Sequence, residues 1–251
     1  MSERSAVTSD ATPPTLLVAI DGPAGSGKSS VSRAAASRLG YGILDTGAAY
    51  RALAWAMRES GAELDSESAA LDVLDGWRYR ITLRGAQRVT VGLPGSDGSS
   101  AAGDDGDADV DVTAAIRANE ISALVSRVSK HPRVRLRLNE MFRGIVADSG
   151  LPGVVIEGRD VTTVIAPDAP VRLLLTASPE VRAERRAGEL PGLSPEQVLA
   201  DLRERDAKDA QVVDFFNPAP GVTLVDTSDL DFEQSVQAVI DVVHEAQEGA
   251  R

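Results

Sequence analysis

A glycine-rich octapeptide at residues 22–29 is the most chemically specific segment of this chain. It runs Gly-Pro-Ala-Gly-Ser-Gly-Lys-Ser and matches the phosphate-binding pattern G-x-x-x-x-G-K-[ST] in full. Glycines let such a loop curl so that its backbone N–H groups point at phosphate oxygens. In this pattern Lys28 reaches the β- and γ-phosphates, and the Ser29 hydroxyl ligates Mg²⁺. The segment predicts an ATP site with Mg²⁺ at Ser29, formed by Gly22, Pro23, Ala24, Gly25, Ser26, Gly27, Lys28, Ser29 and Ser30.

Two further segments carry arginines that could bind a second anion. They are Asp45-Thr-Gly-Ala-Ala-Tyr-Arg51 and Glu157-Gly-Arg-Asp160, and each follows a short apolar run. An arginine can hold a phosphate through two parallel hydrogen bonds, so Arg51 and Arg159 are candidates for an acceptor-phosphate site. The chain lacks an Asn-Lys-x-Asp guanine motif and a Leu-Ser-Gly-Gly signature, which disfavours switch GTPases and one branch of the transport ATPases. A small-molecule kinase fits best, although a salt-bridged or solvated role is the alternative for either arginine alone.

Strands and helices are predicted to alternate around these loops. Short apolar runs predict strands buried on both faces, and the glycine-rich loop lies between the first of them and a predicted helix over Lys28–Leu39. These flanks disfavour a glycine turn that carries Lys-Ser by chance. Predicted strands cover residues 15–20, 41–44, 154–156, 171–175 and 222–225. In the last helix one apolar stripe is expected, made of Phe232, Val236, Val239, Ile240 and Val243.

This alternation predicts an α/β fold with a five-stranded parallel sheet flanked by helices. Ligands bind at the carboxyl ends of the strands in such sheets, so the three loops should lie together. Residues 15–75 and 113–251 are expected to form this core, and Pro132 is placed to begin a helix within it. Residues 76–112 are predicted to be a small β insertion, in which Trp77–Leu83 pairs with Arg88–Val91 and residues 95–109 form a mobile loop. Residues 1–14 are expected to be a disordered leader.

Composition excludes several classes of function. The 251 residues include no cysteine and two histidines, which leaves no basis for disulfides, thiolate chemistry or a three-ligand histidine site. The 38 acidic and 26 basic residues give a formal net charge of −12, which disfavours nucleic acid as a partner. The longest apolar runs are too short to span a bilayer. We therefore expect a cytoplasmic protein, a monomer, with no membrane or nucleic-acid partner.

Taken together, the separated motifs resemble those of the bacterial cytidylate kinases, which transfer the γ-phosphate of ATP to CMP and dCMP. The resemblance extends from about Leu16 to Val243. The segments that carry it are Ile20–Ser29, Asp45–Arg51, Ile116–Glu120, Val125–Ser129 with Pro132–Arg135, Glu157–Asp160 with Pro167–Ala169, and Arg203–Asp206 with Asp209. It implies a P-loop nucleoside-monophosphate kinase fold, with a β-containing insertion over the acceptor site and a short lid at about residues 182–195.

The resemblance also implies roles for individual residues. Thr46, Arg51 and Arg159 would contact the acceptor phosphate, while Ser126, Arg135 and Asp160 would bind the cytosine ring. Arg205 and Asp209 would lie near the sugar and the transferring phosphate. The implied CMP-binding set is Thr46, Arg51, Ser126, Arg135, Arg159, Asp160 and Asp209, and the implied catalytic set is Lys28, Arg159, Arg182, Arg186 and Arg205.

Elementary chemistry supports the role of Asp160. A carboxylate accepts a hydrogen bond from the N4 amino group of cytosine, whereas uracil presents a carbonyl oxygen there. Bound uracil would leave buried polar groups without hydrogen-bond partners, and such a loss makes the discrimination against uracil strong. A helix N-cap after the strand is the alternative role for Asp160, and both roles could hold together.

Arginines on a predicted helix could supply further charge. Arg182, Arg185 and Arg186 fall at i, i+3 and i+4 and so share a helical face, and the Gly188–Gly192 segment predicts a mobile turn after them. The family resemblance implies a lid that closes over ATP. A solvated basic face is the alternative for any one of the three arginines.

Three features depart from the family pattern. Val212 stands where the family usually carries an arginine, and Lys208 or a lid arginine is the candidate to replace that charge. Thr162 stands where a glycine is usual, and the 95–109 segment is longer and more acidic than expected. Two alternatives to CMP phosphorylation therefore stay open at this point. One is a kinase for UMP or a metabolite hydroxyl, with Asp45 as its base, and the other is a nucleotide-binding regulator without transfer activity.

Overall fold

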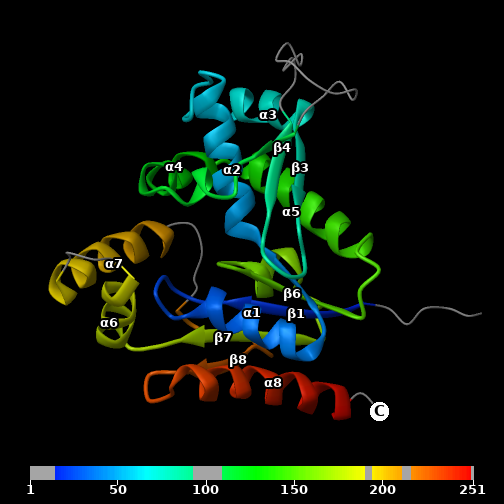
Figure 1. Cartoon of the computed structure of the whole chain (residues 1–251), viewed down its shortest axis with the longest axis vertical. Helices are drawn as coiled ribbons and strands as arrows, with labels where there is room; N and C mark the ends of the chain where they lie inside the picture. The colour runs from blue at the N-terminus through cyan, green and yellow to red at the C-terminus, as the bar shows by residue number, and fades with distance from the viewer. Residues whose placement is uncertain (1–14, 93–108, 190–193, 211–215, 250–251) are drawn as a thin grey trace, which may run out of the picture.

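The computed structural model describes residues 15–92, 109–189, 194–210 and 216–249. Its centre is a parallel sheet of five strands in the order β2-β6-β1-β7-β8 (Figure 1). These strands are β1 (Leu16–Asp21), β2 (Gly42–Asp45), β6 (Gly153–Gly158), β7 (Val171–Thr176) and β8 (Thr223–Asp226). Each overlaps a run in which the sequence predicted a strand. The predicted five-stranded parallel sheet is therefore confirmed.

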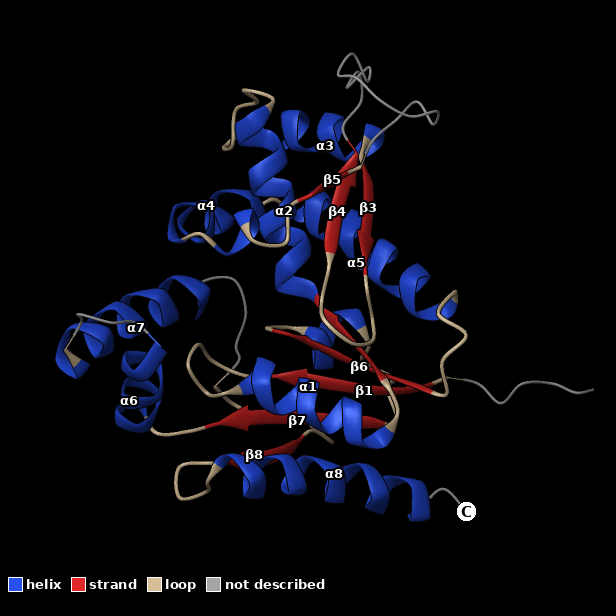
Figure 2. Ribbon diagram, viewed as in Figure 1, coloured by secondary structure: helices blue, strands red, loops and turns tan. Residues whose placement is uncertain are grey.

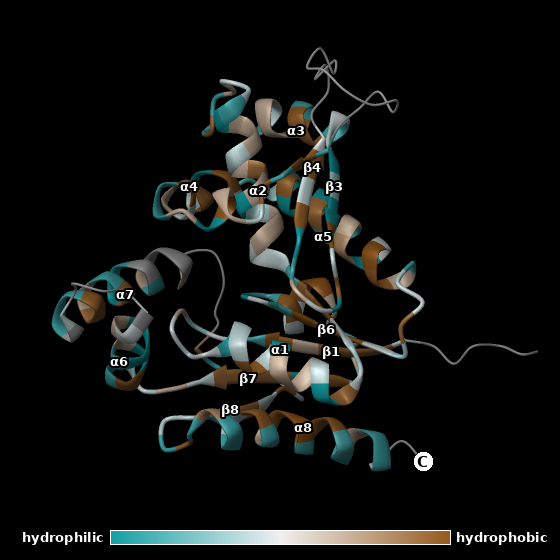
Figure 3. Cartoon of the chain, in the orientation of Figure 1, coloured by the Kyte–Doolittle hydropathy of each residue, from teal (hydrophilic) through white to brown (hydrophobic). Residues whose placement is uncertain are grey.

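Both faces of this sheet are covered, as the continuous apolar runs require. In β1, Val18 and Ile20 pack with the helices α1 (Lys28–Leu39) and α8 (Phe232–Gly249), whereas Ala19 packs on the opposite side. The opposite layer includes the helices α2 (Thr46–Glu59) and α5 (Pro132–Ala147). Figure 2 shows the strands between the helices of the two layers, and Figure 3 shows that these strands are largely apolar. Alternation of side chains across a strand thus divides the core into two clusters.

One residue of the apolar stripe predicted for the last helix is not buried, so that part of the prediction is wrong. Phe232 is 49% exposed, while Val236, Val239 and Val243 of the same helix are fully buried. Phe232 is the first residue of α8, and all of residues 231–234 are exposed. The helix therefore begins before it reaches the sheet, and periodicity alone extends the apolar stripe one turn too far.

A second group of elements lies above the sheet in Figure 1, on the side of α2 and α5. It contains α2, α3 (Glu67–Gly76), α4 (Asn119–Ser129), α5 and a three-stranded antiparallel sheet of β3 (Arg78–Ile81), β4 (Val89–Gly92) and β5 (Val110–Asp111). The expected pairing of β3 with β4 is confirmed, and so is the start of α5 at Pro132. The division of the chain into core, insertion and lid stays a prediction, and residues 1–14 and most of the 95–109 segment lie outside the described residues.

Two further helices lie beside the glycine-rich loop. They are α6 (Pro179–Glu189) and α7 (Pro195–Ala210), and Ala24 of the loop packs among Ala183, Val198 and Leu202 from this pair. Residues 190–193 of the predicted lid lie outside the described residues. Among the helices that are described, none has the length and apolar composition needed to span a lipid bilayer.

Candidate active site

The glycine-rich loop turns tightly between β1 and α1. A Cβ atom at Gly22 would lie 2.2 Å from the carbonyl oxygen of Leu175, so no larger residue fits there. Gly25 and Gly27 have φ angles of 76° and 80°, in the left-handed region that favours glycine. Ser30 donates to the Gly27 carbonyl at 2.9 Å, which ties the loop to the first turn of α1. The loop and the N-terminus of α1 together have the geometry of an anion site.

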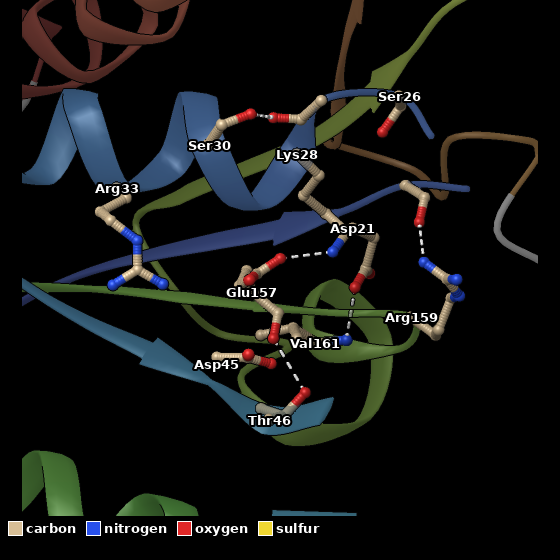
Figure 4. A network of polar contacts seen from close by, with 12 residues as sticks. Asp21, Ser26, Lys28, Ser30, Arg33, Asp45, Thr46, Glu157, Arg159 and Val161 are labelled. Atoms are coloured by element: carbon tan, nitrogen blue, oxygen red, sulfur yellow. Dashed lines mark hydrogen bonds and ion pairs between the residues drawn. The ribbon is translucent and has the colours of Figure 1, made fainter. Parts of the chain in front are cut away.

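Lys28 and Glu157 form a buried ion pair at the centre of the site (Figure 4). Glu157 lies in β6, beside β1, and its backbone carbonyl accepts a hydrogen bond from the Thr46 hydroxyl at 2.8 Å. Its Oε1 atom is buried and has no hydrogen-bond partner among the described residues. Glu157 belongs to the Glu157–Asp160 motif, but no role was predicted for it from the sequence. One residue therefore touches both the ATP-site lysine and an expected CMP-binding residue.

The segment that opens α2 brings a carboxylate and an arginine together. Asp45 caps the helix by accepting from the Ala48 N–H at 3.0 Å, and it accepts from Arg51 at 2.8 Å. Burial raises the pKa of Asp45, but the charges of Arg51 and Lys28 and these hydrogen bonds outweigh it and leave the pKa below its ordinary value. The Arg51 Nε atom is buried without a partner among the described residues. Arg51 thus retains a donor for a ligand.

Asp160 and Arg135 form a second ion pair, which joins the loop after β6 to α5. Burial raises the pKa of Asp160, the Arg135 charge opposes this, and the Asp21 charge adds to it, with a net increase. Asp160 occupies the N-cap position of the short π-helical turn Val161–Ile165, but its side chain makes no capping hydrogen bond. The N-cap interpretation is therefore wrong for its carboxylate. Ser126, expected beside these residues, lies on an exposed part of α4.

Asp21, at the end of β1, does the capping instead. Its carboxylate accepts from the N–H groups of Val161 and Thr162 at 2.8 and 2.9 Å, and from the Thr162 hydroxyl at 2.6 Å. Arg159 donates to the Gly22 carbonyl at 2.6 Å (Figure 4). No role was predicted for Asp21 from the sequence, although its place at the end of a buried strand, directly before the loop, was a usable indication.

The expected lid arginines occupy different environments. Arg182 is only 4% exposed and donates to Asp206 at 2.6 Å and to the Ala24 carbonyl at 3.0 Å, so the solvated-face interpretation is wrong for this residue. Arg185 donates to the Ser26 carbonyl at 3.3 Å. Arg186 lies in the last turn of α6. Helix α6 is thus bonded to the glycine-rich loop.

The remaining expected residues cannot be placed at the site. Arg205, Lys208 and Asp209 belong to α7, but their side chains lie outside the described residues, as does Val212.

Comparisons with known proteins identify the family of this chain. The family model described as "Cytidylate kinase" matches residues 18–245. A protein of Streptomyces avermitilis named "Cytidylate kinase" is 39% identical over 235 residues, which cover 93% of this chain and 95% of the relative. A protein of the same name from Cutibacterium acnes is 41% identical over 231 residues, which cover 91% of this chain and 96% of the relative.

Proposed function

Because the chain belongs to the cytidylate kinase family, we propose how its own residues divide the work of transferring the γ-phosphate of ATP to CMP. The protein is a nucleoside-monophosphate kinase, and the reaction is ATP + CMP giving ADP + CDP. The observation that carries the proposal is the position of Glu157. Its side chain holds the ATP-site Lys28, and its backbone carbonyl holds Thr46 of the expected CMP site.

The acceptor nucleotide is held by groups at the carboxyl ends of β2 and β6. Arg51, Thr46 and Arg159 bind its phosphate, and the free Nε donor of Arg51 supports this role. Asp160 accepts from the N4 amino group of cytosine and is kept in place by Arg135. Uracil would set a carbonyl oxygen against this carboxylate, which explains a preference for CMP over UMP.

The residues beside the phosphate loop fit a Mg²⁺ ion. Oxygen atoms are the ligands that Mg²⁺ prefers, and it commonly keeps several waters while bridging substrate phosphates. Ser29 offers its hydroxyl at the start of α1, and the buried Oε1 of Glu157 is an oxygen without a protein partner among the described residues. When bound with ATP, Mg²⁺ supplies charge neutralisation at the β- and γ-phosphates.

The transfer itself requires positioning and positive charge. The attacking oxygen of CMP is already anionic, so no strong base is needed. Lys28 neutralises charge on the transferring group, and Arg159 orients the acceptor phosphate. Arg182 and Arg186 lie in α6, whose bonds to the phosphate loop place that helix beside the ATP site. These contacts support the catalytic roles expected for the arginines of α6, and dCMP is expected to share the site with CMP.

The test is ADP release with MgATP and each of CMP, dCMP, UMP, AMP and GMP. Fast turnover confined to CMP and dCMP is expected. Lys28→Ala should abolish turnover and keep the circular dichroism spectrum of the wild type, whereas the exposed Lys130→Ala, in an ion pair with Asp65, should behave like the wild type. Turnover with another acceptor but not CMP, or an active Lys28→Ala variant, would refute the proposal. Size-exclusion chromatography tests the expected monomer.

A further inference from the structure

We propose that Asp21 is a positioning residue for acceptor recognition, which anchors the loop of Arg159 and Asp160 to the start of the phosphate loop, and that the Thr162 hydroxyl completes this anchor. The inference rests on the proposed function, because it concerns where the CMP-binding groups stand relative to ATP. It assigns Thr162, which departs from the family pattern, a role in this chain.

The hydrogen bonds at Asp21 carry the first step. Asp21 is 3% exposed, and its three donors among the described residues are neutral: two backbone N–H groups and one hydroxyl. Burial of a carboxylate is costly unless its oxygens are satisfied. This carboxylate therefore holds the turn at Val161 and Thr162 in a fixed place relative to the end of β1.

The second step is that the loop after β6 is attached to two consecutive residues, Asp21 at the end of β1 and Gly22 at the start of the phosphate loop. Arg159 donates to the carbonyl of Gly22, and the amides of residues 161 and 162 donate to Asp21. Asp160 lies between these attachments and contributes no capping bond of its own. Asp21, from a different strand, thus fixes the backbone that carries Asp160, while Arg135 pairs with the Asp160 carboxylate itself.

Close packing couples the position of the turn after β6 to Thr46 of the expected CMP site. A Cβ atom at Gly158 would lie 2.6 Å from the Thr46 hydroxyl and 2.7 Å from a methyl group of Val161, so there is no free space between them. A shift of the turn would move Asp160 and press on Thr46. Loss of the anchor should therefore weaken CMP binding more than ATP binding.

Two substitutions test the anchor. Asp21→Asn puts an NH₂ group against N–H donors and removes at least one bond to a charged acceptor, an effect of tenfold or more. We expect the KM for CMP to rise at least tenfold and the KM for ATP to change less than about twofold. Thr162→Val removes one of the three bonds to the charged Asp21 carboxylate and should raise the KM for CMP about tenfold, while the two bonds from backbone N–H groups remain. Thr162→Ser keeps the hydroxyl and should match the wild type.

A buried hydroxyl away from the site supplies the control. Ser235 is 2% exposed in α8 and donates to the carbonyl of Asp231, the residue just before this helix, so Ser235→Ala should leave both KM values unchanged. A purely structural role of Asp21 predicts equal losses for ATP and CMP that follow thermal stability, and that result would overturn the inference. An unchanged KM for CMP in the variants would also overturn it.

The outcome is separable from the proposed function. A wild-type protein that does not phosphorylate CMP would overturn the proposed function and this inference with it. A wild type that does, with Asp21→Asn and Thr162→Val behaving like it, would overturn the inference alone. If Asp21→Asn does not fold, the KM values for CMP of Thr162→Val and Thr162→Ser test the inference. A higher KM in Thr162→Val alone supports the anchor, and equal values overturn it.

Discussion

Replacing Glu157 by glutamine should weaken the fold and at the same time tighten the binding of ATP without magnesium. The side chains of Lys28 and Glu157 are 10% and 1% exposed, so water screens their ion pair little. Breaking such a pair costs about 3–5 kcal/mol, because one charge stays buried without its partner. The glutamine amide oxygen can still accept one hydrogen bond, so we expect about 3 kcal/mol, or a Tm lower by roughly 6–12 °C for a chain of this size.

ATP reverses part of this loss. Its phosphates give Lys28 a new counter-charge, and the variant no longer has to break the Glu157 pair to bind them. If about half of the lost free energy returns on binding, the Kd for Mg²⁺-free ATP falls roughly tenfold. Turnover with MgATP should nevertheless drop, since the variant lacks the carboxylate oxygen offered to the metal.

Calorimetric titration with ATP in EDTA, together with thermal melts, measures both effects. Glu233→Gln is the matched control. Glu233 pairs with Arg38, which lies in α1 as Lys28 does, but the side chain of Glu233 is 66% exposed. That control should change neither ATP affinity nor Tm appreciably. Unchanged or weaker binding of Mg²⁺-free ATP by Glu157→Gln would refute the partner exchange at Lys28.

Two further predictions follow from the other ion pairs. Carbon-13 NMR should find that Asp160 titrates above its ordinary pKa of 3.8, and Arg135→Gln should raise that pKa further; a midpoint at or below 3.8 would contradict the burial argument. Because the pKa of Asp160 is raised in the folded state, ionisation of this residue lowers the stability of the fold as the pH rises through that value. As the pH falls, the ionised form that binds cytosine is lost at a higher pH than for an ordinary aspartate. Asp206→Asn should lower Tm and raise the KM for ATP about tenfold, because it leaves Arg182 buried without its partner beside the phosphate loop; an unchanged KM for ATP in steady-state kinetics would contradict this.

The sequence was sufficient to predict the strands of the parallel sheet and the class of functional site. Apolar runs and the glycine-rich pattern predicted all five strands of the sheet, because a strand buried on both faces leaves a continuous apolar run. Periodicity was wrong for Phe232, since a pattern of side chains does not show where a helix first touches its sheet. Arg51 and Arg159 were identified as candidates, but their partners were not, because those partners come from segments whose pairing only the fold determines.

Two acidic residues, Asp21 and Glu157, were given no role from the sequence, and Asp45 was considered only as the base of an alternative reaction. All three lie at the carboxyl ends of neighbouring strands, where anionic substrates are expected to bind, so a sequence-based search for positive charge does not point to them. Yet Asp45 holds Arg51, Glu157 holds Lys28, and Asp21 holds the turn after β6. Cations buried without a counter-charge would cost several kcal/mol each before any substrate arrives. Asp45 and Glu157 pair with these cations in the free protein and so stabilise the site without substrate, and we expect both carboxylates to give way to phosphates when the substrates bind.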